Sequence, residues 1–430
     1  MSRLRIRGAR VLDPASGVDE RLDLDIEGQR IAALGPELEG VPEEVIEADG
    51  LWLAPGLVDL HTHLREPGQE YKENIASGTG AAAKGGFTTV CCMANTDPVN
   101  DNTALTEFIQ GRAKETAVVR VRVVAAATQG LRGEIMSEMA RLAAAGAVAF
   151  SDDGAVIMDA SVMRKVLLYA GGVNRPVIAH CEDLHLRGTG VVHEGPHSTR
   201  SGLPSSPEEA ETVMVARDLE LARCSGAHLH IAHVSAARSV ELIREAKAVG
   251  VRVTVEVTPH HLSLTDEVTI GYDANTKMAP PLRTARDREV LREGLADGTI
   301  DCVATDHAPH AAFEKDVEYS KAPFGVVGLE TALSVVLDLV REERLMALEA
   351  IDRLSTRPAR IFGLRAGTLE VGAPADLVVI DPDRVWKVEP ATLVSRSKNS
   401  PFLGYEFRGV AVRTYVGGKL AYALDQEPAR

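Results

Sequence analysis

The stretch PGLVDLHTHLREPG, residues 55–68, joins an apolar segment to two histidines that flank one threonine. In GLVDLH (56–61), only Asp59 interrupts the apolar residues before the first histidine. A strand of this kind is typical of a parallel sheet, because such strands are buried on both faces. His61 and His63 lie two positions apart, so an extended chain turns both imidazoles to the same side. The stretch therefore predicts a buried parallel strand with two metal-competent side chains at its C-terminal end.

Seven similar apolar segments follow along the chain, and helix-like segments separate them. The eight strand candidates are GLVDLH (56–61), TTVCCMAN (88–95), VRVRVVAAA (119–127), AVAFSDD (147–153), PVIAHCED (176–183), HLHIAHVS (228–235), VRVTVEVT (251–258) and IDCVATDH (300–307). Between them lie segments such as NIASGTGAAAKGG (74–86) and SVELIREAKAVG (239–250), which we expect to be helices. Strands that alternate with helices over residues 55–363 predict a (β/α)₈ barrel, which is a TIM-like α/β fold.

The two ends of the chain differ from the middle, because both consist of short strand candidates joined by turns. The N-terminal segment, residues 1–54, has a turn at Glu27-Gly28, and the C-terminal segment, residues 364–430, has one at Gly417-Gly418. Glycine-containing turns between apolar runs indicate β-hairpins. We expect the two segments to meet in one small β-sandwich beside the barrel domain.

The composition excludes several classes of protein. The 430 residues have a formal net charge of −15, which argues against a nucleic-acid partner, since such a surface needs clustered Lys and Arg. No apolar run is long enough for a membrane helix, and the N-terminus lacks the apolar core of a signal peptide. The five cysteines are scattered without a Cys-x-x-Cys pair, which indicates reduced thiols. We therefore expect a cytoplasmic protein that acts on a small molecule.

Polar residues recur at one place on the predicted strands, namely the C-terminal end. These residues are His61, His63, Asn95, Asp152, Asp153, His180, His233 and Asp306, with His310 shortly after the last strand. In a (β/α)₈ barrel those strand ends form the active-site mouth. Imidazole and carboxylate groups suit zinc and similar divalent ions. The set exceeds one open zinc site, so it predicts two metals about 3.5–4 Å apart, bridged by a carboxylate and a hydroxide.

Each of these residues alone has a structural explanation. A single His-x-His pair is often incidental, and a buried histidine is usually satisfied by a hydrogen bond. Asp152 and Asp153 precede Gly154 and also fit a turn. We assign His260 and His261 to structural roles. What favours a metal centre is that six metal-competent side chains fall independently at five strand ends.

At these residues the chain resembles the dihydroorotases of the bacterial type, within the amidohydrolase superfamily. The resemblance covers nearly the whole chain and is most specific in HTHLREPG (61–68) and TDHAPH (305–310). It implies two Zn²⁺ ions per chain, bridged by Asp153 and a hydroxide. In FSDDG (150–154), Asp153 stands where many relatives have a carboxylated lysine. The implied metal ligands are His61, His63, Asp153, His180, His233 and Asp306.

The resemblance also implies a reaction, the reversible cyclisation of N-carbamoyl-L-aspartate to L-dihydroorotate in de novo pyrimidine (UMP) synthesis. In the hydrolytic direction a metal-held hydroxide attacks the ring amide carbonyl, and Asp306 passes a proton to the leaving nitrogen. Arg65 would bind the substrate carboxylate, for which a planar guanidinium is suited. The charged segment 311–323 is predicted to be a lid. The expected substrate contacts are His63, Arg65, Asn95, His310, Phe324 and Gly325.

Two other functions are compatible with these residues. A hydantoinase or allantoinase would share the histidine pair and the barrel, but the arginine in REPG favours a substrate with a carboxylate. A catalytically silent partner of aspartate carbamoyltransferase would typically lose metal ligands, whereas this chain keeps all six. One departure from the family pattern is Ala279, where relatives commonly have a substrate-contacting asparagine. We further expect a homo-oligomer, and an active enzyme is compatible with a complex with aspartate carbamoyltransferase.

Overall fold

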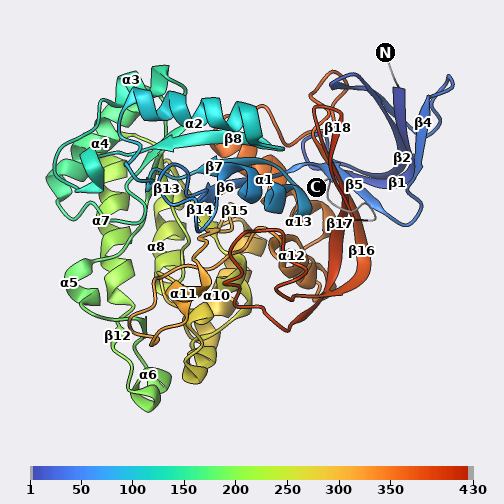
Figure 1. The fold of residues 1–430 in the computed structure, drawn as a ribbon. Coiled ribbons are helices and arrows are strands. Elements are labelled where there is room, and N and C mark those ends of the chain that lie inside the picture. The colour runs from blue at the N-terminus through green and yellow to red at the C-terminus, as the bar shows by residue number, and fades with distance from the viewer. Residues whose placement is uncertain (1–2, 425–430) are drawn as a thin grey trace.

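Eight parallel strands surround the centre of the molecule in the computed structural model, which describes residues 3–424 (Figure 1). They are β6 (Leu57–Thr62), β7 (Phe87–Cys92), β8 (Arg120–Ala125), β9 (Ala149–Ser151), β10 (Val177–Ala179), β13 (Leu229–Ile231), β14 (Val253–Val257) and β15 (Cys302–Val303). Each overlaps one of the eight segments expected from the sequence, so the predicted strand order is confirmed. Most are shorter than expected, because the polar residues at their C-terminal ends leave the sheet and enter the loops.

The sheet closes on itself where β6 meets the segment after β15. Pairing runs in chain order from β6 to β15. The backbone N–H of His63 then donates to the carbonyl of His307 at 2.9 Å, and Thr62 forms a parallel bridge with His307. All residues of β6 and β7 are buried, as strands with packing on both faces require. The (β/α)₈ class is thus confirmed, and the C-terminal ends of the strands share one mouth.

Helices cover the outside of the barrel (Figure 1). They include α1 (Ile75–Lys84), α2 (Thr103–Thr116), α3 (Met139–Ala144), α4 (Ala160–Gly172), α7 (Glu209–Ser225), α8 (Ala237–Ala248), α10 (Ala285–Asp297), α12 (Ala332–Arg341), α13 (Ala347–Ile351) and α14 (Arg357–Ile361). Short elements lie in the loops, namely α5 (Leu184–Arg187), β11 (Val192–His193), α6 (Pro196–Ser201), β12 (Ser205–Ser206), α9 (Pro259–Ser263) and α11 (Ala312–Lys315). Among the described residues, no helix combines the length and the apolar character needed to cross a membrane.

The two ends of the chain combine in a second sheet beside the barrel (Figure 1). Its strands are β1 (Arg3–Asp13), β2 (Val18–Glu27), β3 (Arg30–Gly35), β4 (Glu44–Glu47), β5 (Trp52–Pro55), β16 (Leu377–Lys387), β17 (Glu406–Val416) and β18 (Lys419–Ala423). N-terminal β5 pairs with C-terminal β16. The two predicted hairpin turns also meet, since a Cβ on Gly418 would lie 2.2 Å from the carbonyl oxygen of Gly28. With φ of 72°, Gly418 is also in a conformation that favours glycine.

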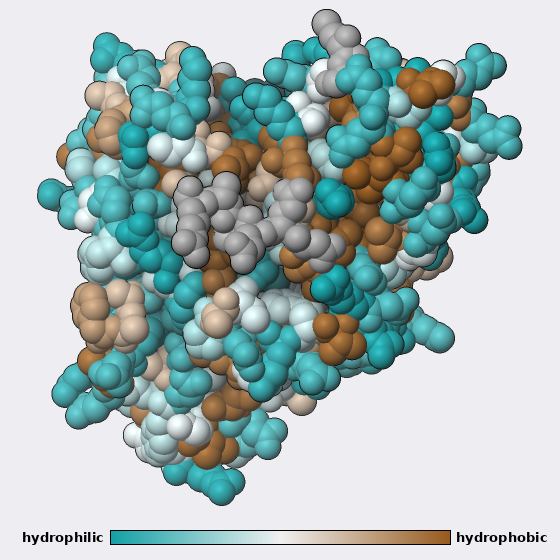
Figure 2. Space-filling view, turned by 45° about the vertical axis from the view of Figure 1, so that its right-hand side comes forward, coloured by the Kyte–Doolittle hydropathy of each residue, from teal (hydrophilic) through white to brown (hydrophobic). Residues whose placement is uncertain are grey.

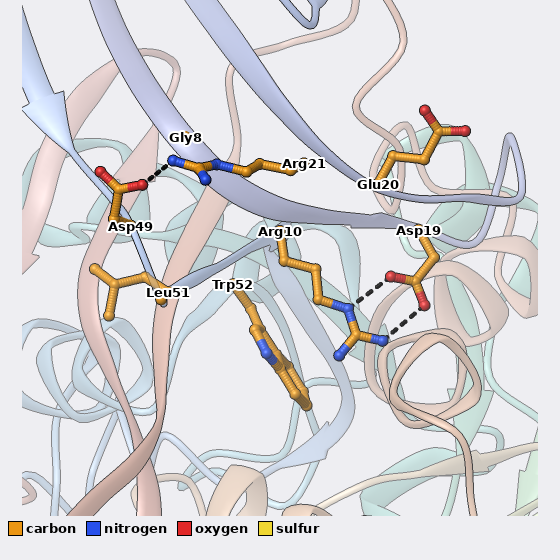
Figure 3. Close-up of a pocket in the computed structure, with 9 residues that line it drawn as sticks. Gly8, Arg10, Asp19, Glu20, Arg21, Asp49, Leu51 and Trp52 are labelled. Carbon is orange, nitrogen blue, oxygen red and sulfur yellow. Dashed lines mark hydrogen bonds and ion pairs between the residues drawn. The ribbon is translucent and has the colours of Figure 1, made fainter.

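A pocket on this terminal sheet has both of its lining arginines paired with carboxylates. Figure 3 shows Arg10 bound through two nitrogens to Asp19, at 2.7 and 2.8 Å, while Arg21 pairs with Asp49. The guanidinium of Arg10 also lies over the Trp52 ring. Because these charges neutralise one another at an exposed surface, the pocket gives no sign of a substrate. Figure 2 shows hydrophilic residues over most of the visible face and apolar residues gathered in its upper right part.

Candidate metal centre and substrate pocket

Two histidines, His61 in β6 and His63 directly after it, face a carboxylate from the opposite end of the sheet order. Nε2 of His63 lies 3.1 Å from Oδ1 of Asp306, and Nε2 of His61 lies 3.5 Å from the same oxygen. Asp306 comes shortly after β15, so the closure of the barrel brings these residues together. Their ligand atoms all lie within 4.8 Å of one another, which is close enough to hold one metal ion.

Asp153, which follows β9, lies between this group and two further histidines. Its Oδ2 is 3.2 Å from Nε2 of His61 and 3.4 Å from Nε2 of His63. Its Oδ1 faces the other pair, 3.4 Å from Nε2 of His233 and 3.5 Å from Nδ1 of His180. One carboxylate thus offers an oxygen to each pair of histidines, as a ligand that bridges two metals must.

The cluster fits a divalent cation in both chemistry and hydrogen bonding. Within residues 3–424, Nε2 of His61 and Oδ1 of Asp153 are buried without a hydrogen-bond partner. Such atoms are costly unless a ligand satisfies them. Imidazole nitrogens and carboxylate oxygens are the donors of catalytic zinc sites and of similar ions. The six residues that the sequence predicts as ligands therefore lie together and suit the metal they were predicted to hold.

The charges around the cluster attract cations. Burial alone would lower the pKa of His61, but the carboxylates, above all Asp153, outweigh it and raise that pKa well above its usual value. Burial likewise opposes the protonation of His180, yet hydrogen bonds to Asp153 and Glu182 raise its pKa to about 10. Sites that hold protons this strongly also favour a divalent cation, which would replace those protons.

Two of the predicted ligands have a strained backbone, and a buried carboxylate holds the residue that precedes one of them. His233 and Asp306 have φ angles of 31° and 46°, a region that costs non-glycine residues about 1–3 kcal/mol. Oδ2 of Asp59 accepts the hydroxyl of Thr305 at 2.5 Å, and Oδ1 accepts the backbone N–H groups of Thr305 and His61 at 3.1 and 3.0 Å. Asp59, the acidic interruption of the first apolar strand, therefore ties the two metal-bearing strand ends together.

Arg65 is a buried cation beside this cluster, and within residues 3–424 no carboxylate forms a direct ion pair with it, although Asp306 and Glu314 are near enough to raise its pKa against the effect of burial. Only 7% of it is exposed. Its contacts within the described chain are with the carbonyl of Pro309, to which Nε donates at 3.2 Å, and with the ring of His310. Burial lowers the pKa of Arg65 to about 10, so the group is still charged at neutral pH. Since an unpaired buried charge is costly, Arg65 indicates that the ligand supplies an anionic group.

Asn95 and His310, both predicted substrate contacts, also form hydrogen bonds within the protein. Oδ1 of Asn95 accepts Nδ1–H of His63 at 2.7 Å, which leaves Nε2 of His63 for a metal. Nε2 of His310 donates to the carbonyl of Phe324 at 2.8 Å. Burial and the charge of Arg65 lower the pKa of His310 to about 2, so the ring is neutral and its Nδ1 only accepts. The hydrogen bond to His63 uses Oδ1 of Asn95 and leaves the amide N–H groups as possible donors to a ligand, whereas the His310 ring as placed offers no N–H; both substrate contacts stay predictions.

The predicted lid, residues 311–323, contains α11 and is anchored to the loop after β14. Nζ of Lys315 donates to the carbonyl of Ala274 at 3.0 Å. The chain then passes through Gly325, whose φ is 121° and whose Cβ, if present, would lie 2.6 Å from that of Ala308. Only glycine permits this approach. The structure thus places Phe324 and Gly325 beside His310, and their contacts with a substrate stay predictions.

Glu256 is a residue that sequence analysis missed. It lies in β14 with no exposed surface, and its Oε1 is 2.6 Å from Nδ1 of His61. The signal that could have found it is the single acid in VTVEV (253–257), because an acidic side chain within a largely buried strand needs a partner inside the barrel. Asp59 is likewise a single acidic residue in a buried strand, β6, and its partners also lie inside the barrel.

Replacing Asp153 by alanine should reduce bound metal to at most one ion per chain, because each of its oxygens faces one pair of histidines. Metal analysis of the purified, metal-saturated variant measures this. Asp152→Asn is the matched control, since Asp152 binds the backbone N–H of Thr128 at 2.8 Å and forms no part of the cluster. Two ions in the Asp153 variant would remove the bridging role.

Two family models match the chain. The Dihydro-orotase-like model matches residues 50–239, and the Amidohydrolase family model matches residues 200–422. Among curated proteins, a dihydroorotase of Pelotomaculum thermopropionicum is 52% identical over 97% of this chain and 98% of its own length. A dihydroorotase of Geotalea daltonii is 51% identical, over 98% of this chain and 99% of its own length.

Solved structures with the same fold include an L-hydantoinase and a dihydropyrimidinase. The L-hydantoinase (dihydropyrimidinase) of Arthrobacter aurescens superimposes with a TM-score of 0.89 at 25% identity, over 98% of this chain and 96% of its own. The dihydropyrimidinase of Brevibacillus agri NCHU1002 gives a TM-score of 0.86 at 25% identity, over 99% and 96%. The barrel and the terminal sheet therefore occur together in both.

Proposed function

The chain belongs to the dihydroorotase family of the amidohydrolases, and from this premise we propose that it interconverts L-dihydroorotate and N-carbamoyl-L-aspartate. Identity of about one half over nearly the full length of curated dihydroorotases supports this reaction. In the hydrolytic direction, the ring C–N amide bond breaks as water adds its oxygen to the carbonyl carbon and a proton to the nitrogen. The proposal places the enzyme in de novo pyrimidine synthesis.

The observation that carries the substrate assignment is the unpaired guanidinium of Arg65. It is buried four residues along the chain from His61, and its neighbours are a carbonyl and a neutral imidazole. Dihydroorotate carries one carboxylate, whereas hydantoin and dihydropyrimidine rings carry none. A planar guanidinium can bind a carboxylate through two hydrogen bonds and so fix the orientation of the ring as well as its charge.

We assign the proton transfers to Asp306. Burial would raise the pKa of Asp306, but the neighbouring His61 and His63 outweigh it and lower that pKa, so the carboxylate is ionised. It can therefore accept the proton of the attacking water and then donate it to the leaving ring nitrogen. Asn95 and Arg65 hold the substrate carboxylate away from the cluster during these steps.

The six-residue set would hold two Zn²⁺ ions, with Asp153 between them. The donor types and the two-sided position of Asp153 support this assignment. Such ions would supply a Lewis acid for the carbonyl and lower the pKa of water toward about 7.

A comparison of three cyclic amides tests the proposed function. The zinc-loaded full chain should hydrolyse dihydroorotate with kcat/KM at least about 100-fold above hydantoin and allantoin, because only dihydroorotate satisfies Arg65. Equal or faster hydrolysis of hydantoin would indicate a hydantoinase. A fully metallated chain that hydrolyses none of the three would instead fit a silent partner of aspartate carbamoyltransferase.

A homo-oligomer, a complex with aspartate carbamoyltransferase and a cytoplasmic location stay predictions. Apolar residues on the face in Figure 2 support an association between protein chains. The five cysteines are all free, which agrees with a reducing compartment.

A further inference from the structure

A chain of four side chains, fully buried nearest His61, leads away from it on the side opposite the metal cluster. Oε1 of Glu256 lies 2.6 Å from Nδ1 of His61, and Oε2 lies 3.0 Å from Nε2 of His230. Nδ1 of His230 is 2.8 Å from Oγ1 of Thr254, which is 2.8 Å from Nε2 of His228. His61, Glu256 and His230 have no exposed surface.

The neighbouring strands β13 and β14 build this chain by their alternation. His228 and His230 lie two positions apart, as do Thr254 and Glu256, so each pair lies on one face of its strand. His230 and Thr254 are cross-strand partners in the parallel register. Glu256 is nearest the mouth, and the chain extends from it toward the N-terminal ends of the strands. The position of Glu256 is thus set by two strands at once.

The hydrogen bonds determine where the ring protons lie. A carboxylate accepts at both oxygens, so Nδ1 of His61 and Nε2 of His230 carry hydrogens. In the His230 tautomer that carries its hydrogen on Nε2, Nδ1 accepts the Thr254 hydroxyl, and Oγ1 of Thr254 then accepts Nε2–H of His228. A cation bound at the cluster would replace the proton on Nε2 of His61, and Nε2, the atom that faces Asp153 and Asp306, would then offer its lone pair as a ligand.

We propose that Glu256 is the positioning residue of His61, and that His230 and Thr254 hold Glu256 in place. Glu256 acts through His61 by fixing its tautomer and ring orientation and by making Nε2 a stronger ligand. Partners of this kind typically change metal affinity by about 10–100-fold when they are removed. The inference rests on the proposed metal site and does not depend on the identity of the substrate.

Glu256→Gln should weaken the affinity of the folded apoprotein for zinc by about 10–100-fold. The amide keeps the size of the side chain but takes away the negative charge and one acceptor oxygen. Competition with a chromophoric chelator measures the dissociation constant, and the melting temperature of the apoprotein reports folding separately. The visible spectrum of the Co²⁺-loaded variant should also change, because the geometry at His61 changes.

Asp376→Asn is the matched control for loss of a buried carboxylate. Asp376 is 4% exposed and pairs with Arg120 beside the terminal sheet. This variant should melt earlier than wild type but bind zinc with unchanged affinity. Unchanged zinc affinity in the Glu256 variant would overturn the inference. A wild-type protein that binds no zinc would instead contradict the proposed function, on which this inference rests.

A measurement on the wild-type protein covers the case in which the Glu256 variant does not fold. In zinc-loaded protein labelled with ¹⁵N-histidine, Nδ1 of His61 should carry a hydrogen that is protected from exchange and resonates downfield. A bare Nδ1 on His61 would overturn the inference without any variant.

Discussion

Replacing Asp306 by asparagine should lower kcat for dihydroorotate hydrolysis by about 10³-fold across the accessible pH range. The amide cannot accept the proton of the attacking water, so the proton transfers proposed for Asp306 are lost. Asparagine is the suitable replacement because it has nearly the same shape and tolerates the left-handed backbone at φ 46°, where alanine would add strain. Steady-state kinetics over a range of pH, at saturating zinc, measure the effect.

The control must separate proton transfer from metal binding, because Asp306 also lies 3.1 Å from Nε2 of His63. Metal content is therefore measured in the same samples, and two ions per chain with little turnover assign the loss to proton transfer. Asp152→Asn removes another carboxylate near the mouth and should keep most of the activity. Turnover near the wild-type rate in the Asp306 variant would remove Asp306 from the mechanism.

The fold could be predicted because its signals are local. Each apolar segment was long enough to indicate a strand buried on both faces, and the alternation with helices left few topologies. The lengths of the strands could not be predicted from these local signals. The segment PVIAHCED (176–183) contributes only Val177–Ala179 to β10, since His180 turns to the metal cluster and Asp183 caps helix α5.

The metal cluster could be predicted because a barrel brings all its strand ends to one mouth. The residues behind the cluster could not, because their partners depend on packing between distant strands. Glu256 binds His61, which lies 195 residues earlier in the chain. The orientation of His310 is likewise set by the carbonyl of Phe324, a backbone atom about which the side-chain pattern carries no information.

Replacing Arg65 by alanine should lower kcat/KM for dihydroorotate by about 10²–10³-fold while both metals are retained. Removing one partner of a buried, hydrogen-bonded charge pair costs about 2–5 kcal/mol, and about 1.4 kcal/mol corresponds to a tenfold change. Most of the loss should appear as a higher KM, because the carboxylate is bound both before and during the reaction. Arg65→Lys keeps the charge and should recover only part of the activity, since lysine lacks the planar pair of donors.

A substrate without the carboxylate distinguishes recognition from general damage to the site. Dihydrouracil has the same reacting amide but nothing for Arg65 to bind, so its kcat/KM should be nearly the same in wild type and in the alanine variant. The ratio of kcat/KM for dihydroorotate to kcat/KM for dihydrouracil should therefore fall by about 10²–10³-fold, which corresponds to the free energy of the lost ion pair. An equal loss of kcat/KM on both substrates would show that Arg65 stabilises the mouth of the barrel through Pro309 and does not recognise the substrate. The structural argument that dihydroorotate is the preferred substrate would then be refuted.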